Sequence, residues 1–247
     1  IEDGMPIVVL APKDRHFEKT ISNMQEVIAR GGKVLMITND KSNIEIITCQ
    51  LFRLSRAGKP VKMSKRSGSF ITLNELIEEV GKDAVRFMMV SRKNDAQLDF
   101  DFEIFKNENN DNPIFYIQYA NARINSLIRN SKDKLGIKIK EKDLIKSDLN
   151  LLKNINERKI IFQIANFPRV IEQSAIFMEP HRLSYYLRDL ASVFHQYWNL
   201  KVNDKRIQIL DKKEIDLSMA RVALLFSVSI TIQIGLSLLG IKAIEEL

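Results

Sequence analysis

The chain has 247 residues, 45% of them apolar, which is enough to bury a sizeable core in one large domain or two modest ones. Its 38 lysines and arginines exceed its 31 acidic residues, and the net charge of +7 mildly favours a polyanionic partner. The single cysteine, Cys49, excludes a disulfide framework and a thiolate cage, and three histidines do not favour a zinc site. We therefore expect a cytoplasmic protein without a bound metal.

The N-terminal segment, residues 1–40, has the pattern of a β-α-β unit. The apolar run MPIVVLAP, from Met5 to Pro12, and the later run KVLMITND are typical of strands buried on both faces. Apolar residues between them follow a helical spacing until Gly31 and Gly32 end the helix. A parallel strand pair with a right-handed crossover is the expected geometry. Because the unit is too small to cover its own sheet, we expect it to pack against other parts of a protein.

The next segment predicts strands and short helices around one cationic loop. Two strands are expected on either side of a turn at residues 57–59, and the second leads into the loop PVKMSKRSGSF. After the loop, Thr72 and Glu75 form the capping-box pattern of a helix start. In the LDFDF segment that follows, Asp99 and Asp101 are more typical of helix capping or ion pairing than of metal binding.

The second half of the chain has a helical pattern. Pro113 suits a first helical position, and its helix is expected to reach about Leu135. Further helices are expected around Pro168, from Pro180, and from about Asp216 to near the end of the chain. Short connectors between amphipathic helices of this length predict a helical bundle.

One segment is long enough and apolar enough to cross a membrane. The stretch from Val222 to Ile241 contains no charge. It does contain several hydroxyl and amide side chains, and it follows an amphipathic helical pattern. We therefore predict the buried helix of a bundle in preference to a transmembrane span.

The loop PVKMSKRSGSF places cations among small residues. Lys65 follows Lys62 by three positions, and Arg66 comes next, beside serines and a glycine. Such a loop suits a mobile clamp on phosphate, because ammonium groups that close on a departing pyrophosphate stabilise its developing charge. A lone K-x-x-K in a loop is more often a solvated turn, so this spacing by itself leaves both interpretations open.

The sequence around the loop resembles a known family. KMSKRSG resembles the KMSKS loop of class I aminoacyl-tRNA synthetases, and the stretch from Leu51 to Glu103 is similar to arginine–tRNA ligases of bacterial type. NPIFYIQYANARI, YLRDLASVFHQYWN and the closing GLSLLGI resemble helices of the anticodon-binding domain of that family. The resemblance covers about residues 46–247.

The resemblance implies ATP as a substrate together with Mg²⁺, and arginine and tRNA(Arg) as the other substrates. It implies that Lys62 and Lys65 contact the ATP phosphates as catalytic residues, and that Met63, Ser64 and Arg66 complete the ATP-binding loop. Arg66 departs from the family pattern, which ends this motif in serine, but it keeps a positive charge there. The resemblance also implies a monomer that does not bind a membrane.

A second ATP element of that family is missing from this sequence. Class I synthetases use H-x-G-H, or a motif close to it, where a helix N-terminus and imidazoles receive phosphate. His16, His181 and His195 all lie outside such a pattern. Whether the chain acts as an enzyme is therefore open, and we expect that alone it does not form arginyl-adenylate.

The N-terminal segment resembles a different family. The stretch from Ile1 to Thr38 is similar to part of the sugar-isomerase domain of glutamine–fructose-6-phosphate aminotransferases. The sugar-phosphate loops and catalytic tail of that family do not occur, so no isomerase residue is assigned. The two resemblances predict a join near residues 43–46. Because the chain begins with Ile1 and shows no leader pattern, we expect a piece of a longer protein.

The helical half offers cations and flat side chains, which RNA binding requires. Tyr116, Tyr119 and Arg123 are spaced to share one helix face, and Arg129 lies further along the same helix. We predict that these four residues bind tRNA, although the shared face fits half-buried packing equally well. Further candidates of both kinds are Tyr185, Tyr186, Tyr197, Trp198, Lys132 and Lys134.

Other helical residues favour structural interpretations. Within FHQYW, Phe194 and Trp198 have the spacing of core residues, and His195 is more typical of an internal hydrogen bond than of a base contact. Four lysines in the connector form a charge run that is typical of a solvated surface: Lys138, Lys140, Lys142 and Lys146.

Together these patterns predict a mixed fold. Residues 1–43 form a β-α-β fragment, residues 44–111 the end of a class I synthetase catalytic domain with its KMSKS-type loop, and residues 112–247 an all-α bundle of the anticodon-binding type. The predicted function is that of the C-terminal portion of an arginine–tRNA ligase, which binds tRNA(Arg) and contributes its loop to ATP-dependent arginylation. The alternatives are a sugar-phosphate isomerase fragment, and an inactive fusion or a tRNA-binding module only.

Overall fold

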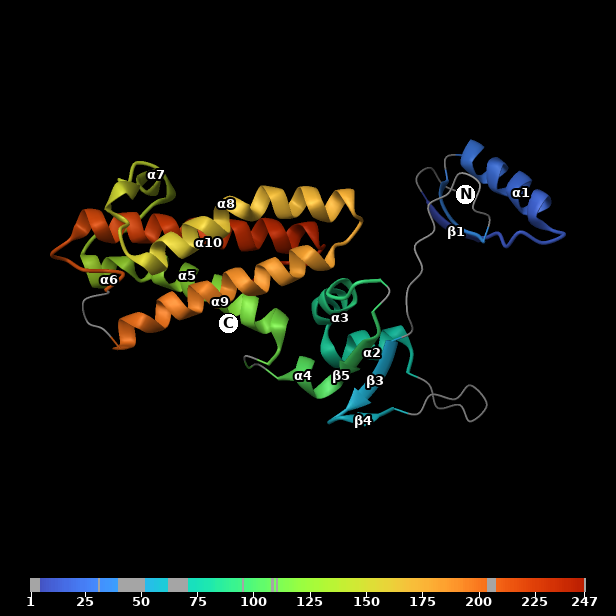
Figure 1. Ribbon diagram of the computed structural model, residues 1–247, viewed down its shortest axis with the longest axis horizontal. Helices are drawn as coiled ribbons and strands as arrows, with labels where there is room; N and C mark the ends of the chain where they lie inside the picture. Colours follow the sequence, from blue (N-terminus) through green and yellow to red (C-terminus); the bar gives the residue numbers. More distant parts are fainter. Residues whose placement is uncertain are drawn as a thin grey trace. The chain divides into compact units, whose positions relative to one another are not determined.

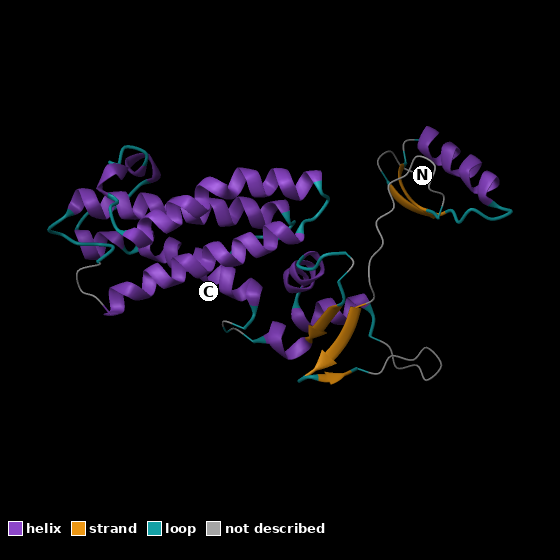
Figure 2. Ribbon diagram, in the orientation of Figure 1, coloured by secondary structure: helices purple, strands orange, loops and turns teal. Residues whose placement is uncertain are grey.

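The computed structural model describes residues 5–30, 32–39, 52–61, 71–94, 96–107, 109, 111–203 and 208–246, without the side chains of residues 29, 52 and 201–203. The chain divides into two compact units, Ile1–Cys49 and Gln50–Leu247. Helices predominate among the described residues, and the described strands all lie in the first half of the chain (Figure 1, Figure 2).

The first unit is a β-α-β unit, as the sequence predicts. Strand β1 (Pro6–Leu10) pairs in parallel with β2 (Lys33–Ile37), and helix α1 (Phe17–Ala29) connects them. The prediction that both strands are buried on both faces is wrong, because the one helix in the described residues of this unit can cover only one face of its sheet. On the other face, Val8 and Leu35 lie opposite each other and are 60% and 63% exposed.

The second unit begins with a small three-stranded sheet. Its strands are β3 (Phe52–Arg56), β4 (Lys59–Pro60) and β5 (Leu98–Asp101), in the order β4-β3-β5. The β3–β4 hairpin lies at the predicted turn, where Ala57 and Gly58 both have positive φ angles. Strand β5 pairs in parallel with β3. Local sequence patterns do not predict this pairing, because the two strands are far apart along the chain.

Polar caps define the short elements of this region. The Thr72–Glu75 capping box starts α2 (Leu73–Val80), which is followed by α3 (Lys82–Val90). Asp101 caps α4 (Phe102–Lys106) and also accepts hydrogen bonds from the turn amides of Ala57 and Gly58 at 3.1 and 2.6 Å. The Gly58 amide is the main cause of the lowered pKa of Asp101. The predicted capping role of Asp101 is thus confirmed.

The remaining elements form a helical bundle, as the sequence predicts (Figure 1). The long helices in the described part of the bundle are α5 (Pro113–Arg129), α8 (Ile155–Ile176), α9 (His181–Asn203) and α10 (Ile215–Leu238). The short elements α6 (Ser131–Leu135), α7 (Glu141–Leu144) and η1 (Leu149–Leu151) connect α5 to α8. The first helix ends at Arg129 and not at the predicted Leu135, because the separate short helix α6 forms the rest of that stretch.

Helix α10 occupies the core of this bundle. It packs against α5, α8 and α9, and Val222, Leu225 and Val228 on it have no exposed surface. Among the described residues it is the one helix long and apolar enough to cross a membrane, and 61% of its most apolar window is buried. Its place in the bundle confirms the predicted core helix.

A buried polar cluster ties α8, α9 and α10 together. The Nε atom of Arg221 donates to Oε1 of Glu157 at 2.8 Å, and the hydroxyl of Tyr197 donates to the same oxygen at 3.1 Å. Arg221 also donates to the carbonyl of Gln208 at 2.6 Å. Burial, reinforced by the neighbouring Glu157 charge, raises the pKa of the Tyr197 phenol. This cluster fixes the relative positions of three helices through charge-assisted hydrogen bonds.

The end of the chain runs along α5. Gln118 donates to the carbonyl of Lys242 and accepts from the amide of Ile244, both at 2.7 Å, and Asn121 donates to the carbonyl of Ile244 at 2.9 Å. The side chain of Arg86 on α3 donates to the carbonyl of Leu239 at 2.5 Å. Polar side chains thus hold this segment in place by pairing with its backbone.

Candidate nucleic-acid interface

The predicted ATP loop lies outside the described residues. Lys62, Met63, Ser64, Lys65 and Arg66 all belong to it, and their predicted roles stay predictions. The structure describes the elements on either side of the loop: β4 ends at Pro60, shortly before these residues, and the helix α2 begins at Leu73 after them. The amide of Val61 donates to the carbonyl of Leu54 at 2.8 Å, which joins the start of the loop to the sheet.

An ion-pair cluster joins the hairpin before the loop to the helix after it. Arg56 on β3 and Lys106 on α4 both contact the carboxylate of Glu79 on α2, with Lys106 Nζ at 2.6 Å from Oε1. The hydrogen bond from Arg56 is the largest cause that lowers the pKa of Glu79 to about 2, and Lys106 adds to it. These contacts join the described elements on either side of the loop residues.

We expect this cluster to give a measurable pH dependence. The pKa of Glu79 is lower in the folded chain than its ordinary value of 4.5, so its stabilisation is complete above pH 4.5 and is lost as the pH falls through about 2. Because the side chain is partly exposed, the Glu79→Gln variant should lose less than about 1 kcal/mol at neutral pH. The difference in melting temperature between wild type and variant, measured from pH 6 to pH 2, should shrink towards zero.

The control for this experiment is Glu78→Gln. Glu78 is exposed on the same helix and forms no ion pair with any described residue. A Glu79→Gln difference that stays constant over the whole range, or that Glu78→Gln reproduces, would contradict the cluster as its source.

Three of the four predicted tRNA-binding residues meet helix α9. Tyr116, Tyr119 and Arg123 lie on successive turns of α5, and together with His195 and Trp198 of α9 they form what we call the α5–α9 seam. The His195 ring centre lies 4.5 Å from that of Tyr116 and 5.6 Å from that of Tyr119. The Arg123 guanidinium lies 4.2 Å from the Tyr119 ring centre and 5.4 Å from that of Trp198.

The seam is half-buried. Tyr116, Tyr119, Arg123 and Trp198 all keep part of their surface exposed, although Tyr116 also packs against the bundle core. The structure therefore shows the half-buried packing that the spacing permitted, and RNA contact stays a prediction. Partial exposure leaves some of the surface of these side chains available for contact with a ligand.

Arg123 carries the charge of the seam. Within the described parts of the chain no carboxylate lies within ion-pair distance of its guanidinium, which is stacked on aromatic rings. A stacked guanidinium keeps its N–H edges free to donate in its plane. Such an arrangement can bind a phosphate oxygen at the edge of the guanidinium while a base stacks nearby.

His195 connects the two helices of the seam. Its Nε2 lies 3.1 Å from the carbonyl oxygen of Tyr116, and the residue is only 6% exposed. Burial is the main cause that lowers the pKa of His195, and the positive charge of Arg123 lowers it further. The hydrogen bond to the Tyr116 carbonyl raises this pKa, but it does not outweigh the other two effects. The predicted internal hydrogen bond of His195 is confirmed.

Arg129 does not lie in the seam. Both of its terminal nitrogens lie 3.3 Å from the carbonyl oxygen of Glu245, and Nη2 lies 3.4 Å from a carboxylate oxygen of Glu246. It shares a face of α5 with Gln118 and Asn121, which hold the same C-terminal segment. Its role in tRNA binding stays a prediction, and its guanidinium already has partners in this structure.

The aromatic candidates of α9 fall into two groups. Tyr186 and Tyr197 are 5% and 0% exposed, so the prediction that they offer faces to RNA is wrong. Tyr186 uses its hydroxyl internally, donating to the carbonyl of Gln163 at 2.8 Å. Phe194 is a core residue, as predicted, whereas Trp198 is only partly buried and reaches Arg123. The sequence contains a signal for the position of Trp198 beside His195. Trp198 follows His195 by three positions, which places both residues on one face of helix α9.

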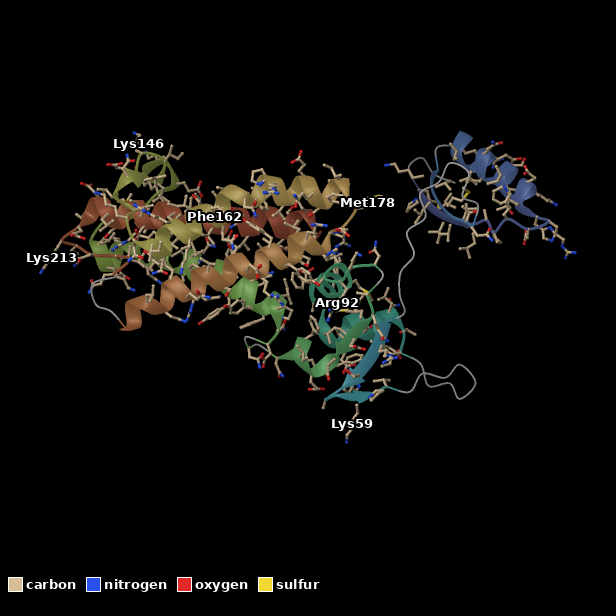
Figure 3. All side chains as sticks on the ribbon, viewed as in Figure 1. Lys59, Arg92, Lys146, Phe162, Met178 and Lys213 are labelled. Atoms are coloured by element: carbon tan, nitrogen blue, oxygen red, sulfur yellow. The ribbon has the colours of Figure 1, made fainter. Side chains whose placement is uncertain are left out.

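The remaining candidates agree with the structural interpretations. The four connector lysines are exposed, and Lys146 stands out from the end of the bundle beside α7 (Figure 3). Among the residues that the structure describes, no three or more histidine, cysteine or acidic side chains group in a way that could hold a metal ion.

The comparison with known families defines the class of this bundle. Residues 117–247, more than half of the chain, match the family model of the DALR anticodon binding domain. The chain belongs to this family. Its relatives among known proteins include arginine–tRNA ligases: that of Parvibaculum lavamentivorans is 45% identical over 211 residues, which cover 85% of this chain. The match covers 36% of that relative, so the chain spans about a third of its length.

Solved structures agree with this fold. A Campylobacter jejuni protein assigned as an arginyl-tRNA synthetase aligns with 97% of this chain and 47% of its own, with a TM-score of 0.68 and 23% identity. The arginyl-tRNA synthetase of Thermus thermophilus aligns with 99% of this chain and 41% of its own, with a TM-score of 0.59 and 21% identity. At these identities the likeness shows the fold alone. Together with the sequence relatives, it supports similarity to the C-terminal region of arginine–tRNA ligases.

The comparisons do not support the resemblance of residues 1–40 to a sugar-isomerase domain. The first unit is a single β-α-β element, and such elements occur in many unrelated α/β proteins, so its fold does not identify a family. The predicted join at residues 43–46 lies outside the described residues.

Proposed function

We propose that this chain binds tRNA(Arg) through the α5–α9 seam of its anticodon-binding domain. The observation that carries the proposal is the Arg123 guanidinium, stacked on Tyr119 and near Trp198 with no carboxylate partner among the described residues. A phosphate can reach the free edge of the guanidinium while an unstacked loop base lies against an aromatic face. Family membership and the net charge of +7 support an RNA partner.

We also propose that the KMSKS-type loop takes part in ATP-dependent arginylation of tRNA. In this role Lys62 and Lys65 would bind the ATP phosphates, with Mg²⁺ and with Met63, Ser64 and Arg66 completing the loop. The charge of the two lysines would stabilise the departing pyrophosphate. Because the sequence lacks the H-x-G-H element, the chain alone should be inactive in arginine-dependent pyrophosphate exchange. We propose that it acts in the cytoplasm and is a monomer.

The test of the tRNA proposal is direct binding. Labelled tRNA(Arg) is titrated with the purified full chain at two salt concentrations, with a non-cognate tRNA as competitor. Preference for tRNA(Arg) that persists at the higher salt is expected. Binding that ignores tRNA identity and collapses with salt would show that only the net positive charge acts, and would overturn the proposal.

A further inference from the structure

The protonation of the His195 ring follows from its hydrogen bond. Nε2 lies 3.1 Å from the Tyr116 carbonyl oxygen, and a carbonyl oxygen can only accept, so Nε2 carries the hydrogen and donates it. Burial lowers the pKa of this residue, which favours the neutral ring. A neutral ring with its hydrogen on Nε2 has a lone pair on Nδ1. Nδ1 is therefore a hydrogen-bond acceptor.

Nδ1 is accessible, although the residue is only 6% exposed. In the described parts of the chain every fully buried side-chain nitrogen or oxygen atom has a hydrogen-bond partner. The polar contact of His195 with described residues is made by Nε2, and no described residue pairs with Nδ1. Nδ1 is therefore not sealed in the core and must reach the surface. It is an unpaired acceptor at the edge of a nearly buried ring.

The surroundings of Nδ1 hold the ring rigidly. Tyr116, Tyr119 and Phe194 have ring centres 4.5, 5.6 and 5.1 Å from that of His195, and the Nε2 hydrogen bond fixes its rotation. An acceptor held in one orientation loses little entropy when it binds a donor. The charged side chain near the His195 ring is Arg123, and the other titratable side chains that pack against this ring are Tyr116 and Tyr119.

The ligand of this atom must be a donor. Phosphate oxygens cannot donate to Nδ1, so a phosphate that binds Arg123 does not satisfy it. In RNA the donors are the ribose 2′-hydroxyl and the base N–H groups, which are the exocyclic amino groups and, on unpaired guanine and uracil, the imino N–H. We propose that Nδ1 of His195 accepts a hydrogen bond from one of these groups, on a tRNA nucleotide bound in the α5–α9 seam. This inference rests on the proposed function and adds a specificity-determining residue to it.

The matched variant is His195→Gln. The amide nitrogen of glutamine can take the place of Nε2 and donate to the Tyr116 carbonyl, but glutamine has no atom equivalent to the Nδ1 acceptor. The variant should keep the melting temperature of the wild type within about 3 °C. Its affinity for tRNA(Arg) should fall about 3–10-fold, the effect of one lost hydrogen bond. His195→Ala, which loses both bonds, should lose stability as well.

The two possible donors are separated on the RNA side. Wild type and His195→Gln are titrated with full-length tRNA(Arg) carrying single 2′-deoxy nucleotides in the anticodon loop, or single base analogues that lack one exocyclic amino or imino N–H donor. One substitution should weaken binding about 3–10-fold in the wild type and have no effect in the variant. If the sensitive substitution is a 2′-deoxy nucleotide, the ribose hydroxyl is the donor; if it is a base analogue, the base N–H that the analogue lacks is the donor.

The possible failures are distinguishable. If the wild type shows no preference for tRNA(Arg), the proposed function fails and this inference fails with it. If the wild type binds and His195→Gln binds equally well, the inference alone is overturned. The same holds if each RNA substitution has equal effects in the two proteins. If His195→Gln melts well below the wild type, the wild-type protein is titrated with the RNA series alone. The inference is then overturned if no single RNA substitution weakens binding.

Discussion

Replacing Glu157 with alanine is expected to lower the free energy of unfolding of the bundle by about 3–5 kcal/mol. The carboxylate is 1% exposed and receives hydrogen bonds from Arg221 and Tyr197. Its removal leaves the Arg221 guanidinium buried without a counter-charge, and this unpaired charge is the main source of the loss. Urea denaturation followed by the fluorescence of Trp198, the only tryptophan in the chain, reports on the bundle itself.

Two comparisons separate the buried charge from other causes. The double variant Glu157→Leu with Arg221→Met removes both charges and should be more stable than Glu157→Ala, because no charge is left unpaired. Glu179→Ala breaks the ion pair with Arg182, which is partly exposed, and should cost less than about 1 kcal/mol. Equal losses for Glu157→Ala and Glu179→Ala would contradict the interpretation.

Replacing Arg123 with glutamine is expected to weaken tRNA(Arg) binding about 5–100-fold. It should also reduce the slope of log affinity against log salt concentration by about one, the contribution of one phosphate contact. The reason is that Arg123 provides both the charge of the seam and a flat group stacked on Tyr119. Arg123→Lys keeps the positive charge but loses the planar group that stacks on Tyr119. Compared with Arg123→Gln, it should restore the salt dependence of the wild type but only part of its affinity. Both are measured by titration at several salt concentrations.

The matched control is Arg169→Gln on helix α8. Arg169 is exposed and lies outside the seam, so this change removes the same charge from another surface. It should change affinity by less than about 3-fold, through net charge alone. Equal effects of Arg169→Gln and Arg123→Gln would show that binding depends on overall charge and not on the seam.

The helical bundle was largely predictable from local patterns. Capping signals such as Thr72–Glu75 and Asn112–Pro113 mark helix starts closely, because a cap satisfies the free amides of its own first turn. The apolar run from Val222 correctly indicated a core helix, since a helix that is apolar on nearly all sides is stable only when surrounded.

Parts of the candidate site depended on contacts that local patterns do not contain. The prediction grouped Arg129 with Tyr116, Tyr119 and Arg123, whereas the structure engages Arg129 with the end of the chain. The burial of Tyr186 and Tyr197 results from the packing of α9 against α8 and α10. Whether an aromatic side chain faces solvent or core is set by which helix covers it.

The sequence by itself determined most element types, the bundle, the cationic loop motif and the face shared by Tyr116, Tyr119 and Arg123. These features follow from periods and caps that act over short stretches of chain. Only the tertiary structure decided that this face meets His195 and Trp198, which lie far along the chain. It also decided that Glu157 pairs with Arg221, and which nitrogen of His195 is paired. Such pairings depend on how helices cross, which no local spacing encodes.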